Sequence, residues 1–153
     1  MKKILLCTPL LLLFLPGMLA QNKTAKTTVK RTIPSAQKSI VAGKAVYTKY
    51  CLTCHQADGG GVPNMNPPLE KTEYVLGDKN RLINIILRGL DKEIEINGDT
   101  YVNPMPSHDF LKDKEVADVL TYIRNSFGNK ASAVTAAEVK KARLNSKPNP
   151  NTH

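Results

Sequence analysis

The run Cys51-Leu52-Thr53-Cys54-His55 constrains this chain more than any other feature of its sequence. A Cys-x-x-Cys-His run is typical of c-type haem attachment. Two thiols at this spacing can form thioethers with the two vinyl groups of one haem, and the histidine that follows can then ligate the iron. We therefore predict one covalent haem c, attached through Cys51 and Cys54, with His55 as an axial ligand. Such a cofactor supplies redox chemistry that the protein tunes.

Two other interpretations of the motif have less support in the sequence. A thioredoxin-like dithiol normally lies in a βαβ context, and no such alternation of strands and helices is predicted here. A structural zinc site needs four ligands and is usually rich in cysteine. The only other cysteine of the chain is Cys7, which lies in a segment that we expect to be removed.

The N-terminal residues have the pattern of a secretory signal. Lys2 and Lys3 precede an apolar stretch over residues 4–15, and small residues lead up to Ala20. We predict a signal peptide over residues 1–20, cleaved after Ala20, and hence a periplasmic protein. The alternative is an uncleaved N-terminal membrane anchor, for which the apolar stretch is barely long enough.

The formal net charge of +9 is unevenly distributed and outlines the domain organisation. Residues 39–129, the predicted haem domain, contain 10 Lys+Arg and 12 Asp+Glu, whereas the polar linker over 21–38 has five basic and no acidic residues. The basic tail over 130–153 has five basic residues and one acidic residue. We expect such single-sign segments to be solvated and mobile, with weak contact to an anionic membrane or an acidic protein. Because no aromatic residues alternate with the basic ones, we predict no binding to nucleic acid.

Local signals predict helices on both sides of the haem motif. Ser35 or Ser39 can cap a helix that runs into Cys51. Asp78 is a typical N-cap, and Gly89 should end the helix that Asp78 opens.

Further local signals lie in the second half of the chain. The dipeptide Asn97-Gly98 between alternating residues predicts a small two-stranded hairpin. Asp113 is predicted to cap a last core helix that Gly128 closes. Thr135 and Glu138 have the spacing of a capping box, which predicts a short basic helix within the tail.

Met105 is the favoured second axial ligand. It follows His55 by 50 residues, which is enough chain to reach the opposite face of a haem. Met65 follows His55 by only ten residues, and we interpret it as a packing residue. His108 could substitute for Met105, and His153 lies on the tail. A methionine ligand would favour the reduced iron and would fill its sixth position.

With these motifs, the chain resembles the monohaem class I c-type cytochromes of bacteria. The resemblance covers about Ser39 to Gly128. It rests on four patterns besides the haem motif: Gly43-x3-Tyr47-x3-Cys51, Pro67-x-Leu69, Met105-Pro106 and Val119-x2-Tyr122. It implies an all-α fold of three to five helices around one haem, with the first and last core helices crossing near Gly43. It also implies export, and that the carbonyl of Pro67 accepts a hydrogen bond from His55 and so fixes its tautomer.

The expected function is one-electron transfer as a soluble periplasmic carrier, without enzymatic activity of its own. The partners would be redox proteins: a dehydrogenase or reductase as donor and an oxidase or reductase as acceptor. The alternative is a haem subunit held in a dehydrogenase or reductase complex, for which the predicted helix in the tail is the supporting feature. A third class, a haem-based ligand sensor or peroxidase, needs an open iron and fails if Met105 is a ligand.

Overall fold

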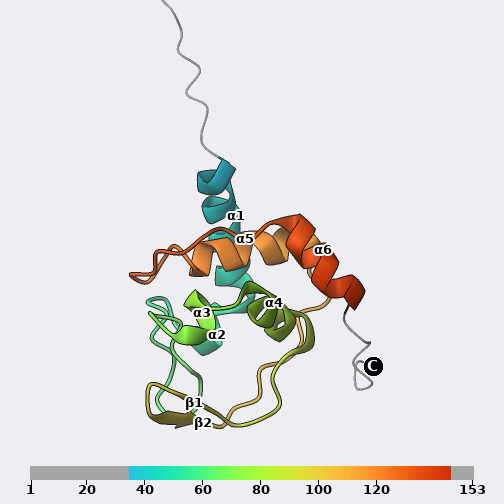
Figure 1. The fold of residues 1–153 in the computed structure, drawn as a ribbon. Helices are drawn as coiled ribbons and strands as arrows, with labels where there is room; N and C mark the ends of the chain where they lie inside the picture. Colours follow the sequence, from blue (N-terminus) through green and yellow to red (C-terminus); the bar gives the residue numbers. More distant parts are fainter. Residues whose placement is uncertain (1–34, 146–153) are drawn as a thin grey trace, which may run out of the picture. The chain divides into compact units, whose positions relative to one another are not determined.

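The computed structural model describes residues 35–145. Six helices and one hairpin follow in this order: α1 Ser35–Tyr50, α2 Leu52–His55, α3 Glu73–Leu76, α4 Lys79–Arg88, β1 Ile94–Ile96, β2 Asp99–Tyr101, α5 Asp113–Ile123 and α6 Ala136–Asn145 (Figure 1). The all-α fold with a minor hairpin is confirmed. The predicted signal peptide lies outside the described residues. Helix α1 begins at Ser35, so residues 35–38 are helical and do not belong to the predicted linker.

Helices α1 and α5 cross at Gly43. A Cβ atom on Gly43 would lie 2.0 Å from the carbonyl oxygen of Asp118, so only glycine allows the two backbones to approach this closely. The rings of Tyr47, Tyr122 and Phe127 pack together beside the crossing, with centroids 5.3 to 5.6 Å apart. This crossing sets the direction of α1 and therefore the position of the haem motif that follows it.

Helix α4 begins and ends where its sequence signals predict. The carboxylate of Asp78 accepts the backbone N–H of Arg81 at 2.6 Å, and the chain leaves the helix at Gly89 with φ of 75°. One face of the helix is buried, and it carries Leu82, Ile83, Ile86 and Leu87. Helix α4 thereby contributes four side chains to the apolar core.

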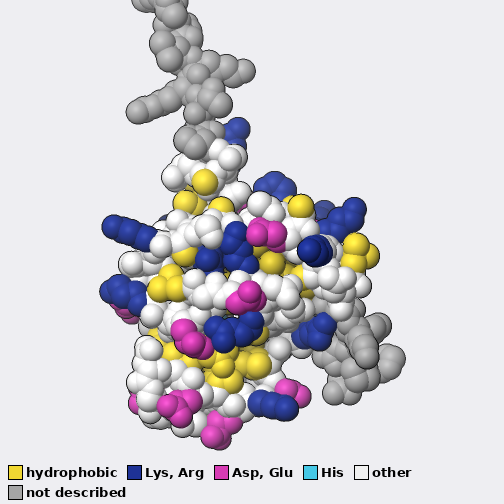
Figure 2. Space-filling model, in the orientation of Figure 1, with side chains coloured by type: hydrophobic (Ala, Val, Ile, Leu, Met, Phe, Trp, Pro, Cys, Tyr) yellow, Lys and Arg dark blue, Asp and Glu magenta, His cyan; other side chains and the backbone are white. Residues whose placement is uncertain are grey.

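The hairpin has the predicted two-residue turn. Asn97 and Gly98 both have positive φ, at 56° and 89°, as a tight primed turn requires. The strands pair antiparallel with Ile94 opposite Tyr101. Along the first strand apolar residues alternate with acidic ones, and Figure 2 shows acidic side chains gathered at the end of the domain where Figure 1 places the hairpin.

Helix α5 differs from its predicted boundaries at both ends. Asp113 is the first helical residue and does not cap the helix; the carboxylate of Glu115 accepts the N–H of Lys112 at 2.8 Å instead. The helix ends at Ile123, five residues before Gly128. Gly128 with φ of 76° belongs to the turn beyond the helix. Beyond the helix, the side-chain amide of Asn129 donates to the carbonyl of Ile123 at 2.8 Å, so this carbonyl is satisfied without a further helical turn.

The part of the tail that the structure describes, residues 130–145, is packed, so the expectation of a solvated, mobile segment is wrong for it. The capping box at the start of α6 is confirmed: Thr135 Oγ1 accepts the N–H of Glu138 at 3.2 Å, and Glu138 Oε2 accepts the N–H of Thr135 at 2.7 Å. Val139 and Ala142 are buried against the core. Two ion pairs tie α6 to the helices beneath it, Lys79–Glu138 at 3.0 Å and Arg143–Asp113 at 2.8 Å. The predicted end of the tail, 146–153, lies outside the described residues.

Candidate functional site

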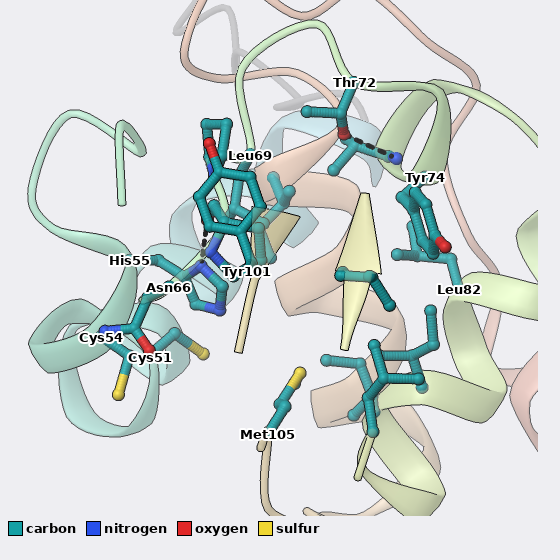
Figure 3. Close-up of a pocket in the computed structure, with 18 of the residues that line it drawn as sticks. Cys51, Cys54, His55, Asn66, Leu69, Thr72, Tyr74, Leu82, Tyr101 and Met105 are labelled. Atoms are coloured by element: carbon teal, nitrogen blue, oxygen red, sulfur yellow. Dashed lines mark hydrogen bonds between the residues drawn. The ribbon is translucent and has the colours of Figure 1, made fainter. Parts of the chain in front are cut away.

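A large, mostly apolar cavity lies beside the haem motif (Figure 3). Its empty volume is about 1050 Å³, part of it open to solvent. The apolar lining comes from α3, α4, α5 and the hairpin, and includes Val75, Leu82, Ile86, Ile96 and Leu120. All five sequence-predicted site residues line it as well: Cys51, Cys54, His55, Pro67 and Met105. The fold therefore brings together residues that are up to 54 positions apart.

One side of the cavity, the His55 wall, is formed by residues 51–69. Cys51 is buried and Cys54 is exposed, at the junction of α1 and α2. The Nδ1 atom of His55 lies 3.0 Å from the carbonyl oxygen of Pro67. Because a carbonyl can only accept a hydrogen bond, Nδ1 carries the proton and Nε2 keeps its lone pair. Burial lowers the pKa of His55, so the ring is neutral and suited to bind a metal.

Tyr47, on α1 before the motif, stabilises the His55 wall. Its hydroxyl donates to the carbonyl of Gln56 at 2.6 Å, directly after α2. Burial raises the pKa of Tyr47, so its hydroxyl stays a neutral donor. The N–H of Gly61 donates to the carbonyl of His55 at 3.2 Å. These contacts hold the backbone of the motif on both sides.

The other side of the cavity, the Met105 wall, is formed by residues 103–108. Met105 and Leu90 exchange both backbone hydrogen bonds, each 2.8 Å long. Ser107 Oγ donates to the carbonyl of Leu87, and the N–H of His108 donates to the carbonyl of Ile86, also at 2.8 Å. The final turn of a helix leaves its carbonyls without intrahelical partners. In α4, the Met105 wall supplies hydrogen-bond donors to two of these carbonyls, those of Ile86 and Leu87.

Gly89 allows the Met105 wall to approach α4. A Cβ on Gly89 would lie 2.3 Å from the carbonyl oxygen of Met105. The two walls also meet at their ends, where the Asn103 side chain donates to Asn66 Oδ1 at 3.2 Å and the Asn103 N–H donates to the carbonyl of Met65. No sequence motif indicated the roles of Leu90, Ser107 and Asn103. Only the glycine at the end of α4 was a signal for them.

The other residues considered as ligands from the sequence have different positions. The side chain of Met65 does not line the cavity, and the residue is 48% exposed. His108 lies at the cavity, with Nδ1 2.9 Å from the carbonyl of its neighbour Pro106. His153 is outside the described residues. Arg81 on α4 pairs with Glu73 at 3.1 Å.

The residues of the cavity fit a covalently bound haem. Two thiols lie in one turn of chain at its edge, and one neutral imidazole has an Nε2 that makes no hydrogen bond within residues 35–145. The cavity itself is largely apolar, as a haem macrocycle requires. In Figure 3 the sulfur of Met105 also reaches into the cavity, from a different segment than His55.

Comparison with known proteins identifies this arrangement. The sequence profile of the cytochrome c family matches residues 40–127. The chain belongs to the cytochrome c family. It is 37% identical over 110 residues to cytochrome c-552 of Thermus thermophilus, which covers 66% of this cytochrome and 83% of that protein.

Other relatives of this cytochrome c are much longer proteins. The cytochrome c subunit of a quinone alcohol dehydrogenase from Gluconacetobacter polyoxogenes is 36% identical over 125 residues, which are 80% of this chain but 26% of that subunit. The fructose dehydrogenase cytochrome subunit of Gluconobacter japonicus is 30% identical over 118 residues, 71% of this chain and 23% of that subunit. This chain thus spans about a quarter of the length of the dehydrogenase subunits that it matches.

Family membership settles the cofactor and the type of chemistry. This class I c-type cytochrome carries covalent haem c, for which Cys51, Cys54 and His55 supply the attachment motif, and electron transfer is the chemistry of its family. When bound, the haem would supply an iron able to accept and return one electron. The protein provides an apolar enclosure, a neutral imidazole of fixed tautomer and a second wall that closes the cavity. Within residues 35–145, no helix has the length and apolar composition needed to cross a membrane.

Proposed function

We propose that this cytochrome c is a periplasmic one-electron carrier whose iron is ligated by His55 and Met105. The observation that supports this best is the position of the two side chains, which enter one cavity from two separately built walls (Figure 3). The backbone pairing of Met105 with Leu90 holds the methionine in place without help from a ligand. Met65 is not favoured as a ligand, because it does not line the cavity.

Methionine ligation would suit a carrier and would disfavour catalysis. A thioether on iron stabilises the reduced state and raises the reduction potential relative to two histidine ligands. It also fills the sixth position, which a ligand sensor or a peroxidase needs open. The protein would then have no enzymatic activity of its own and would act only by exchanging electrons with other proteins.

The partners would be redox proteins, a dehydrogenase or reductase as donor and an oxidase or reductase as acceptor. Encounters between electron-transfer proteins are small and transient, so a carrier needs no large apolar interface. The secretory pattern of residues 1–20 supports the periplasm as the compartment. Haem is attached outside the cytoplasm in the bacterial family that the chain resembles, which agrees with export.

Visible spectroscopy of the oxidised and reduced holoprotein tests the ligands. We expect a low-spin spectrum with the weak red-edge band of methionine–iron ligation, and we expect Met105→Ala to lose that band. Met65→Ala and His108→Ala are matched controls, because they remove the other methionine of residues 35–145 and the histidine near Met105 in the same loop. Both should keep the band. A high-spin wild-type spectrum that Met105→Ala leaves unchanged would overturn the proposal and would direct attention to ligand binding.

A second candidate function is that of a haem subunit held in a dehydrogenase complex. The names of the longer relatives favour it, since two of them are subunits of an alcohol dehydrogenase and a fructose dehydrogenase. The tail helix no longer does, because α6 packs on this chain's own α4 and α5. Size-exclusion chromatography of the native holoprotein separates the two candidates: a carrier elutes alone, and a subunit elutes with its dehydrogenase.

A further inference from the structure

Arg124, the C-cap residue of α5, is a buried cation that belongs to neither the His55 wall nor the Met105 wall. It is 3% exposed and is the only buried lysine or arginine among residues 35–145. An arginine keeps its charge in proteins, and removing a charge from water is costly unless it is compensated. Its surroundings therefore need an explanation.

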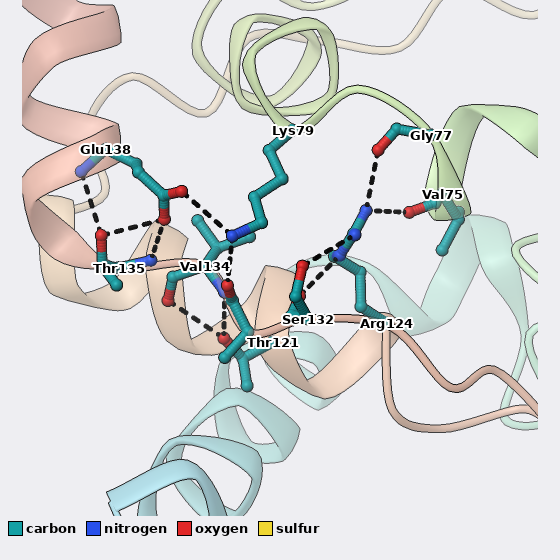
Figure 4. Close-up of polar contacts among 10 residues, drawn as sticks. Val75, Gly77, Lys79, Thr121, Arg124, Ser132, Val134, Thr135 and Glu138 are labelled. Carbon is teal, nitrogen blue, oxygen red and sulfur yellow. Dashed lines mark hydrogen bonds and ion pairs between the residues drawn. The ribbon is translucent and has the colours of Figure 1, made fainter.

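Backbone carbonyls surround the Arg124 guanidinium (Figure 4). Nη1 donates to the carbonyls of Val75 and Gly77 at the end of α3, and Nε donates to the carbonyl of Ser132 at 2.9 Å. Nη2 lies 3.5 Å from Ser132 Oγ. These dipoles solvate the guanidinium, and the C-terminus of α5 itself favours a cation. Dipoles do not neutralise a charge, however, so the positive charge persists.

No carboxylate within the described residues forms an ion pair with Arg124. Glu138 is the acidic group that interacts with it electrostatically, but Glu138 already pairs with Lys79 at 3.0 Å. Figure 4 shows this pair beside the Arg124 contacts. Together, Arg124, Lys79 and Glu138 carry a net charge of +1.

This charge lies directly behind the cavity wall. Val75, whose carbonyl accepts from Arg124, lines the haem cavity. Leu120 and Ile123, which precede Arg124 on α5, line it too. The low-dielectric side chains between the guanidinium and the cavity screen a charge much less than water does.

We propose that Arg124 raises the reduction potential of the haem. The oxidised haem carries one more positive charge than the reduced haem, so a buried cation behind the cavity wall destabilises the oxidised state. Burial and local charge are among the means by which a protein tunes haem iron. Arg124 is thus a positioning and electrostatic residue, not a ligand: it ties α3 and the 130–135 segment to α5 and at the same time sets the driving force of electron transfer.

Redox titration of the holoprotein tests the proposal. For Arg124→Gln we expect the equilibrium constant for reduction to fall by about tenfold, which equals 59 mV for a one-electron couple. Arg124→Lys retains a cation and should keep the potential closer to the wild type, even where its unfolding midpoint drops as much as that of Arg124→Gln. Variants with lower stability but the wild-type potential would show a purely structural role and would overturn the proposal.

A second pair of variants leaves Arg124 in place. Ser132→Asp puts a carboxylate within reach of Nη2, while Ser132→Asn is its neutral match. We expect Asp to lower the reduction equilibrium constant several-fold relative to Asn, with the fold intact because Ser132 is exposed. The same Asp in the Arg124→Gln background should shift the potential much less. An equal shift in both backgrounds, or none in either, would overturn the proposal.

Discussion

The two walls of the haem cavity are held in place by different kinds of contact. In the His55 wall, the contacts join residues close in sequence: Tyr47 to Gln56 over nine positions and His55 to Pro67 over twelve. In the Met105 wall, the contacts reach back to α4, and Ser107 bonds to Leu87 over twenty positions. Long-range contacts require the rest of the fold to be in place first. The methionine side should therefore be the more easily opened half of the site.

The largest expected effect comes from breaking the frame that both walls share. Gly43→Ala places a Cβ 2.0 Å from the Asp118 carbonyl oxygen, and overpacking of this kind costs about 1–3 kcal/mol. Helix propensity alone predicts the opposite sign, a gain of about 1 kcal/mol. Denaturant unfolding of the holoprotein, followed by circular dichroism, measures the difference.

Ala45→Gly is the control for the Gly43 prediction. Ala45 is exposed on the same helix, so this change reports propensity without the crossing and should cost about 1 kcal/mol. A Gly43→Ala protein as stable as the wild type or more so would mean that α1 and α5 can separate at no cost, and would contradict the account of the crossing.

A smaller change should show that the two walls differ in their resistance to denaturant. Ser107→Ala removes the hydrogen bond to Leu87, which is 2.8 Å long, and should cost about 1 kcal/mol. We expect the red-edge methionine band to disappear at a lower denaturant concentration than in the wild type, while the helical signal moves less. Ser126→Ala is the control, because within residues 35–145 Ser126 makes hydrogen bonds only through its backbone. If band and helix shifted together, the two walls would open as one unit.

The sequence predicted contacts between residues a few positions apart better than contacts between distant residues. The Asp78 cap, the Asn97-Gly98 turn and the Thr135–Glu138 capping box depend on residues within a few positions, and all three were predicted correctly. The Asp113 cap was wrong, because such a pattern does not say which of several acidic residues near a helix start will bond to the backbone.

Packing at a distance escaped prediction. Composition gave residues 130–145 the character of a solvated tail, yet Val139 is fully buried and Arg124 bonds to Ser132. In the sequence, four basic residues against one acidic residue gave this segment its solvated character, although eight of its sixteen residues are alanine, valine or leucine. Only the fold shows that Val139 and Ala142 pack into the core. The same holds for the site, where the proposed ligands come from motifs but Leu90 and Ser107, which hold the Met105 wall, have no motif.

The smallest expected effect concerns Pro67 and separates its ring from its carbonyl. Pro67→Ala keeps the oxygen that lies 3.0 Å from His55 Nδ1, so the visible spectrum and the potential should not change. Stability should fall by at most about 1 kcal/mol, through the greater freedom of the unfolded chain.

Gly61→Ala is the complementary change, because it keeps the ring and displaces the carbonyl. Its Cβ would lie 2.3 Å from the Asn66 carbonyl oxygen and 2.7 Å from that of Pro67, at a residue with φ of 70°. We expect this variant to shift the potential and to lose more stability than Pro67→Ala, because the imidazole loses its fixed acceptor. If Pro67→Ala instead had the larger effect on the potential, the proline ring and not the carbonyl would orient His55. The His55 wall would then depend on side-chain packing, and its contrast with the Met105 wall, which backbone hydrogen bonds largely hold, would be sharper still.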